Sequence, residues 1–148
     1  MSATTHVHPT PSDREQIEET LYRYASSIDA GDHERLRTLL ADDARAKYGA
    51  RDWLEGADAV VAFIRDKGAD VGWQHHLLSV YHVDVEGDEA AALTYHTSYQ
   101  IARDRPDEAA VIVARYHDRL MRVDGRWLIR EKRMEIGWRE TRAGTSFL

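Results

Sequence analysis

The first part of the chain carries apolar side chains at helical spacing, separated by short polar breaks. In the first such segment the apolar residues fall on one helical face, and Ser12 or Asp13 can cap its start. A Gly-containing break follows this segment. The pattern predicts helices over residues 13–29, 33–43 and 57–67, with a short strand over 44–48 and its hairpin return at 52–56.

The second part of the chain alternates with a period of two, which is typical of strands. In the second of these strands Leu93, Tyr95 and Tyr99 share the more apolar face, which we expect to face the core. Turn residues separate the segments, most clearly at Asp124-Gly125. The predicted long strands cover residues 74–85, 89–102, 109–123 and 126–139.

Helices gathered before hairpin-connected strands predict an α+β fold, with the helices on one face of the sheet. We expect three N-terminal helices packed on a strongly curved antiparallel or mixed sheet, with a cone-shaped pocket between the two layers. A single domain is expected over residues 13–140, between a flexible tail at 1–12 and a C-terminal tail at 141–148.

Composition narrows the classes of function. The formal net charge is −6 and the basic residues are interleaved with acidic ones, which argues against a nucleic-acid partner. The chain has no Cys, so a thiol nucleophile or a thiolate metal site is excluded. We see no apolar run of membrane-spanning length and no signal-peptide pattern at the start, so we expect no membrane partner and a cytoplasmic location. The histidines show no metal-ligand spacing, and no metal or other cofactor is expected.

Two adjacent histidines at the start of a strand are the strongest candidates for chemistry. Because strand side chains alternate, only one of His75 and His76 can face the interior. We predict that His76 does, with Asp29 at the end of the first helix as its partner. A carboxylate on one ring nitrogen would fix the tautomer and leave the other nitrogen free as a general base. A purely structural hydrogen bond is the alternative.

Several segments of the chain resemble the SnoaL-like branch of the nuclear-transport-factor-2-like superfamily, a branch that is similar to scytalone dehydratase and hexachlorocyclohexane dehydrochlorinase. The resemblance implies that Asp29 orients His76 for proton transfer, and that Arg133 lines the pocket. The chain departs from the family pattern at Val80, where Asn is common, and at Tyr24, where the dehydrochlorinase-like pattern has Lys. The resemblance covers residues 12–138 and rests on residues 22–32, 39–44, 75–77, 115–120, 124–127 and 133–138.

Several other residues are candidates for binding a substrate. Tyrosine hydroxyls could polarise a carbonyl, aromatic rings could form walls, and arginines that continue a core face could anchor an oxygen. For each, burial in an ordinary core or an ion pair, such as Arg133 with Glu131, is the alternative. His96 is a candidate second histidine, although its strand parity opposes the apolar face. The predicted substrate-binding residues are Tyr24, Tyr48, Trp53, Tyr99, Arg115, Arg133 and Trp138.

These features predict a cofactor-independent lyase, isomerase or cyclase that uses the His76–Asp29 pair on a hydrophobic small molecule, cyclic or polyketide-like. One alternative is a ligand-binding or assembly module that resembles the small subunit of a ring-hydroxylating dioxygenase, and another is a monooxygenase-like or hydroxylating enzyme. An open pocket would favour the enzyme, and a filled one would favour the module. In either case we expect a homo-oligomer, a dimer or a trimer, formed through the outer face of the sheet.

Overall fold

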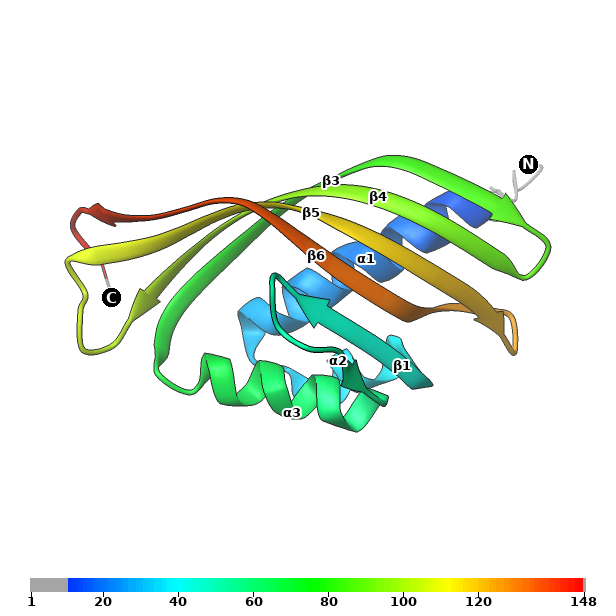
Figure 1. The fold of residues 1–148 in the computed structure, drawn as a ribbon, viewed down its shortest axis with the longest axis horizontal. Coiled ribbons are helices and arrows are strands. Elements are labelled where there is room, and N and C mark those ends of the chain that lie inside the picture. Colours follow the sequence, from blue (N-terminus) through cyan, green and yellow to red (C-terminus); the bar gives the residue numbers. More distant parts are fainter. Residues whose placement is uncertain (1–10, 148) are drawn as a thin grey trace, which may run out of the picture.

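The computed structural model describes residues 11–147, and the tail predicted at the N-terminus lies largely outside them. Within them the chain forms helices first and long strands afterwards (Figure 1). The helices are α1 (Asp13–Ala30), α2 (His33–Thr38) and α3 (Ala57–Gly68). The strands are β1 (Leu40–Tyr48), β2 (Leu54–Glu55), β3 (Val71–Glu86), β4 (Glu89–Ala102), β5 (Glu108–Val123) and β6 (Arg126–Ala143).

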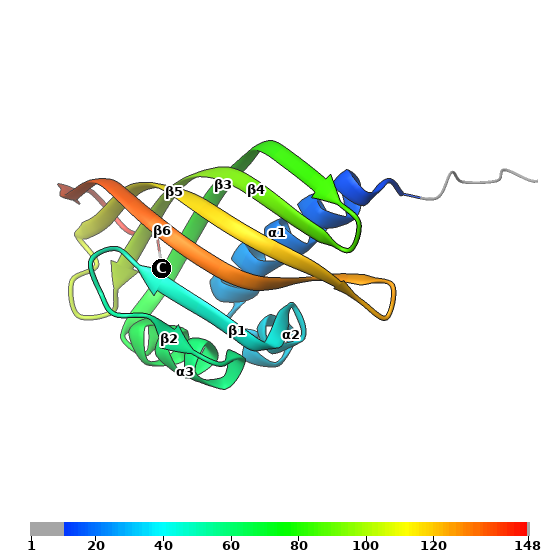
Figure 2. The ribbon, with the colours of Figure 1, turned by 45° about the vertical axis from the view of Figure 1, so that its right-hand side comes forward.

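The described strands form one six-stranded mixed sheet in the order β2-β1-β6-β5-β4-β3. The hairpins from β3 to β6 are antiparallel, whereas β1 runs parallel to β6. The α+β class is therefore confirmed, but the prediction of a strongly curved sheet is wrong. The long strands bend and twist, yet the sheet stays open between the edge strands β2 and β3 (Figure 2).

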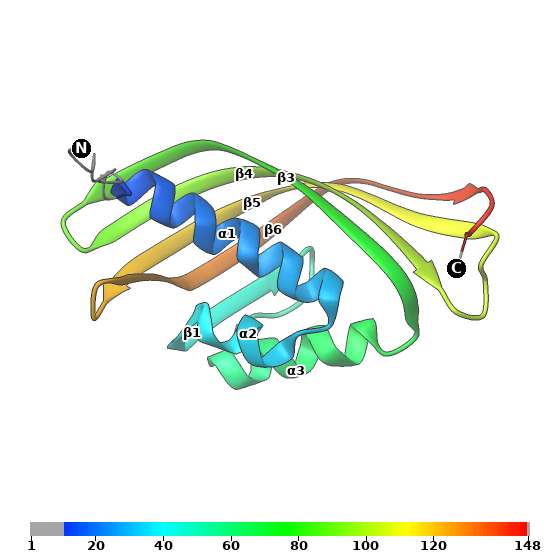
Figure 3. The ribbon, with the colours of Figure 1, turned by 180° about the vertical axis from the view of Figure 1, so that it is seen from behind.

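All three described helices lie on one face of this sheet (Figure 3). Helix α1 begins with a capping box, in which the Ser12 hydroxyl accepts from the Glu15 amide and the Glu15 carboxylate accepts from the Ser12 amide. It ends at Gly31, whose φ of 65° is the left-handed conformation that glycine adopts without strain. These two signals fix the length of α1 and place Asp29 in its last turn.

The second predicted helix is shorter than expected. Helix α2 ends at Thr38, and β1 begins at Leu40, so Asp42 and Asp43 belong to a strand. Leu36, Leu39 and Leu40 are buried nonetheless, because both the short helix and the start of β1 face the same core. None of the helices in the described range, residues 11–147, is long and apolar enough to cross a membrane.

The face of β4 that covers the core carries small and polar residues rather than the larger apolar ones. Ala90, Ala92, Thr94, His96 and Ser98 are buried, whereas the alternate residues, Leu93 to Tyr99, are more exposed on the other face. The prediction that the face of β4 with Leu93, Tyr95 and Tyr99 points to the core is therefore wrong. Small side chains on the inner face leave space for α1 and for a cavity, which a row of Leu and Tyr would fill.

Two β-bulges in β6 change which residues point inward. The pairing with β5 skips Arg130, between Ile129 and Glu131, and again skips Gly137, between Ile136 and Trp138. Each extra residue reverses the alternation that follows it. The inward positions on β6 are consequently Trp127, Ile129, Lys132 and Met134, followed by Ile136 and Arg139 at the cavity.

Candidate active site

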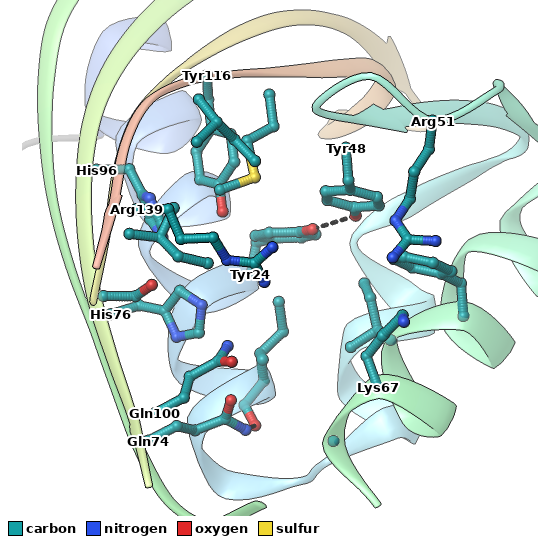
Figure 4. A pocket seen from close by; sticks show the side chains of 18 residues that line it. Tyr24, Tyr48, Arg51, Lys67, Gln74, His76, His96, Gln100, Tyr116 and Arg139 are labelled. Carbon is teal, nitrogen blue, oxygen red and sulfur yellow. Dashed lines mark hydrogen bonds between the residues drawn. The ribbon is translucent and has the colours of Figure 1, made fainter. Parts of the chain in front are cut away.

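A cavity of about 200 Å³ lies between the helices and the sheet (Figure 4). Helix α1 contributes Tyr24 and Ile28, α3 contributes Phe63, Ile64, Lys67 and Gly68, and β1 contributes Tyr48. The sheet supplies the opposite wall, with both polar and apolar side chains. Its lining residues are Gln74, His76, His96, Ser98, Gln100, Ile112, Tyr116, Met134, Ile136 and Arg139, and Arg51 from the segment after β1 completes the cavity.

The end of α1 is tied to β3 through the Asp29 carboxylate. Asp29 Oδ1 lies 2.5 Å from His76 Nδ1, and Oδ2 accepts the His76 backbone N–H at 3.0 Å. The Gln74 side-chain amide also donates to the Ile28 carbonyl at 2.8 Å. A carboxylate in the last turn of a helix opposes the helix dipole, and these bonds from β3 offset that cost. The structure thus brings His76 and Asp29 into direct contact.

This arrangement gives the two ring nitrogens of His76 different surroundings. Nδ1 is held by the carboxylate, while Nε2 has no hydrogen bond within residues 11–147. The ring lines the cavity, and its side chain is only 6% exposed. The neutral ring bonded in this way carries its proton on Nδ1, so the lone pair of Nε2 is available for proton transfer. His75 points away from the cavity and contacts Trp73 and Tyr99.

A second histidine, His96, lies beside His76 on the neighbouring strand. Its ring centroid is 5.2 Å from that of His76 and 4.9 Å from that of Tyr116. Neither ring nitrogen has a hydrogen-bond partner among the described residues, and the same is true of the Ser98 hydroxyl, which also lines the cavity. Burial, together with nearby His76 and Lys132, lowers the pKa of His96 to about 3. His96 is therefore a neutral donor or acceptor for a ligand.

The lowered pKa of His96 predicts a specific loss of stability in mild acid. The unfolded chain binds a proton at this residue below about pH 6.5, whereas the folded chain does not until about pH 3. Stability therefore falls as the pH drops through this window, by about 1.4 kcal/mol per unit. When the pH is lowered from 7 to 5, the unfolding free energy measured by urea denaturation should fall by about 2 kcal/mol more in the wild type than in His96→Gln.

The control for this measurement is His82→Gln, which removes an exposed imidazole from the same sheet. It should keep the wild-type dependence of unfolding free energy on pH. If His96→Gln also keeps that dependence, His96 is not the buried neutral group described here.

Three tyrosines form the inner end of the cavity. The hydroxyls of Tyr24 and Tyr48 lie 2.5 Å apart, and the ring of Tyr24 meets that of Tyr116 edge to face. Burial raises the pKa of all three hydroxyls. They are therefore neutral near pH 7. One hydroxyl of the Tyr24–Tyr48 pair donates to the other, so the second hydroxyl of the pair and that of Tyr116 are the donors able to bind a carbonyl or developing oxyanion.

Behind the tyrosines lies a buried ion pair that the sequence did not reveal. Lys132 Nζ is 2.8 Å from Asp118 Oδ1, and the two side chains are 2% and 0% exposed. The same ammonium lies over the rings of Tyr116 and Tyr24, at 3.9 and 4.4 Å from their centroids. Burial raises the pKa of Asp118 and lowers that of Lys132, while their mutual attraction opposes both shifts. The Lys132 ammonium of this pair therefore packs against both aromatic rings.

Of the predicted substrate-binding residues, Tyr24 and Tyr48 line the cavity and the other five lie elsewhere. The bulge at Arg130 turns Arg133 outward, and the bulge at Gly137 does the same to Trp138, which is 60% exposed. Tyr99 and Arg115 lie on the outer face of β4 and β5, with the Arg115 guanidinium over the Tyr95 ring. Trp53 stacks on Arg45 beside β2.

Sequence reasoning missed several residues that line the cavity. Alternation did place His96 and Ser98 on one face of β4 together with Thr94, but that face was taken as the outer one. Tyr116 follows the same alternation on β5 as buried Ala114 and Asp118. For Arg51, Lys67 and Arg139 the sequence gives no signal, because exposed cations are common on any surface.

The comparisons with known proteins agree with the fold. The SnoaL-like domain family matches residues 9–133, so the chain belongs to this family, which is part of the NTF2-like group. None of the curated proteins compared matches the chain significantly.

Solved structures share the same fold at low sequence identity. A protein assigned as a scytalone dehydratase from Novosphingobium aromaticivorans is 20% identical, with a TM-score of 0.79 over 91% of this chain and 93% of the other. A type 2 hexachlorocyclohexane dehydrochlorinase is 16% identical, with a TM-score of 0.81 over 91% and 92%. The type 3 enzyme from Novosphingobium barchaimii is also 16% identical, with a TM-score of 0.80 over 91% and 93%. These similarities establish the fold, and the reaction has to be argued from the site.

Proposed function

We propose that the protein is a cofactor-independent lyase, isomerase or cyclase in which His76 removes a proton from carbon. The observation that carries this proposal is the contact between Asp29 Oδ1 and His76 Nδ1, at 2.5 Å, on the wall of a cavity. It leaves Nε2 as the base, and the carboxylate stabilises the imidazolium that forms. Asp29 acts through His76 and is a positioning residue.

The tyrosines supply the second half of this chemistry. Removing a proton beside a carbonyl creates an enolate, and hydrogen bonds from neutral hydroxyls stabilise the developing charge. Tyr24 and Tyr116 are buried and Tyr48 is half-buried, and all three are uncharged and line the same cavity as His76. A substrate held between the tyrosines and His76 can then lose a leaving group, shift a double bond or close a ring. The names of the similar solved structures include a dehydratase and dehydrochlorinases, which are enzymes that catalyse eliminations.

The alternative function, an assembly module with a filled pocket, has less support. The cavity has a volume of about 200 Å³, enough for a ligand of roughly a dozen heavy atoms. Unpartnered polar groups, His96 and the Ser98 hydroxyl, face it. Burying such groups without partners costs free energy, and a ligand that bonds them would offset the cost.

A simple elimination tests this proposal without knowledge of the natural substrate. In 5-nitrobenzisoxazole a base takes the carbon-bound proton, the electron pair forms a nitrile, and the N–O bond breaks to give a coloured phenolate. We expect the wild-type protein to catalyse this reaction with saturation kinetics, at a rate per site at least about 100 times that of free imidazole at equal concentration. A rate that never saturates and equals that of free imidazole would contradict a base inside the cavity.

A further inference from the structure

Three cations border the cavity that contains His76. Arg51 follows β1, Lys67 lies near the end of α3, and Arg139 lies near the end of β6. Figure 4 shows Arg51 and Lys67 on the side facing His76, and Arg139 extending from the sheet side into the space between. We call these three residues the mouth cations, because each lines the cavity and is also exposed to solvent.

No acidic side chain in the described range balances the mouth cations. None of the three forms an ion pair within residues 11–147, and no Asp or Glu lines the cavity there. The half-buried Asp29 carboxylate is paired with His76, and the buried Asp118 carboxylate is paired with Lys132. In this chain of formal net charge −6, nine of the 17 described arginines form an ion pair with an acidic side chain, and neither Arg51 nor Arg139 is among them.

Two of the mouth cations also lie near the same aromatic ring. The Arg51 guanidinium and the Lys67 ammonium lie 5.5 and 5.8 Å from the centroid of the same ring, that of Phe63. That ring stacks on Tyr48, which lines the cavity. An anion bound beside this ring would be attracted by both cations.

From these observations we propose that the substrate of the site carries a carboxylate, which the mouth cations bind while the carbon to be deprotonated lies at His76. This inference rests on the proposed function and narrows its substrate from a hydrophobic molecule to an amphiphilic one. The apolar body would contact Ile28, Phe63 and Ile112. Arginine favours a carboxylate over a single point charge because its planar donors match the two oxygens.

The test is a comparison of two probes of nearly the same shape, the anion cinnamate and the neutral cinnamamide, by calorimetric titration at pH 7.5. We expect the wild-type protein to bind cinnamate about tenfold more tightly than cinnamamide. Raising NaCl from about 0.02 M to about 0.5 M should weaken cinnamate binding several-fold and leave the amide nearly unchanged. Equal affinity for the two probes, or tighter binding of the amide, would overturn the inference.

Variants assign the charge preference to particular residues. Arg51→Gln, Lys67→Gln and Arg139→Gln should each weaken cinnamate about fivefold, and the triple variant about 50-fold or more. The matched control is Arg65→Gln, which removes an exposed cation from α3 that does not line the cavity and should bind cinnamate like the wild type. Arg65→Gln weakening cinnamate as much as Lys67→Gln would show a general charge effect and contradict the assignment.

The binding experiment and the elimination experiment fail independently. Binding of cinnamate does not require His76 to act as a base, so His76→Gln should keep the preference for cinnamate over cinnamamide. If elimination is absent while the preference holds, the proposed reaction is wrong and the anion site stands. If elimination is present while the preference is missing, the reaction stands and the carboxylate inference is wrong.

Discussion

His76→Gln should lower the rate of 5-nitrobenzisoxazole elimination by about 10² to 10⁴-fold, the usual contribution of a positioned general base. Glutamine can keep a hydrogen bond to Asp29, but its amide has no lone pair basic enough to take a proton from carbon. The side chains are similar in size, so the cavity should keep its shape. The loss should therefore appear in kcat more than in KM.

The neighbouring histidine provides a matched control. His75→Gln makes the same chemical change one residue away, on the exposed side of β3. It should leave the elimination rate within about twofold of the wild type, because substitutions outside the site have small effects. Equal loss in both variants would mean that the change acts through the strand rather than through the cavity.

Asp29 should show an intermediate effect. Asp29→Asn keeps the side-chain volume but removes the charge that stabilises the imidazolium and fixes the tautomer. We expect the rate to fall by about ten- to 1000-fold, less than or equal to the loss in His76→Gln. Activity at the wild-type level in Asp29→Asn, measured under the same conditions, would remove Asp29 from the mechanism.

Breaking the buried ion pair should have the largest effect on stability. Lys132→Met leaves the Asp118 carboxylate buried without a partner, and Asp118→Asn leaves the Lys132 ammonium in the same position. Because a lone buried charge is strongly unfavourable, each variant should lose about 3 to 5 kcal/mol of unfolding free energy. The change can be followed by urea denaturation with tryptophan fluorescence, since the chain has four Trp residues.

The double variant separates the cost of an unpaired charge from a general packing defect. Lys132→Met combined with Asp118→Leu replaces both charges with apolar groups, and such replacements are often neutral or stabilising. We expect it to be more stable than either single variant by at least about 2 kcal/mol. If the double variant loses as much unfolding free energy as the two single variants together, the two charges contribute to stability independently.

The sequence predicted the elements of this fold well because their signals are local. The capped first helix, the third helix and the turns at Gly87 and Asp124-Gly125 are all where the pattern placed them. Local features placed Asp29 at a helix end and showed that only one of His75 and His76 can face the interior, but they do not by themselves pair His76 with Asp29. The family resemblance supported that pair, and its catalytic role remains a prediction.

The remaining lining of the cavity depended on features that the pattern does not encode. The inner face of β4 is the less apolar one, because small residues make room for α1 and the cavity. Nothing in the sequence marks the bulge at Arg130, which exchanges Arg133 for Lys132 as the buried cation. The mouth cations come from three separate segments and meet only in the folded chain.

The measurement that tests the central claim most directly is the tautomer of the His76 ring, observed by nitrogen-15 NMR of the labelled protein. When the ring is neutral, we predict a proton on Nδ1, bonded to Asp29, and a bare Nε2 with its lone pair toward the cavity. In Asp29→Asn this preference should weaken. A proton on Nε2 in the neutral wild-type ring would contradict the account, because no base would then face the cavity.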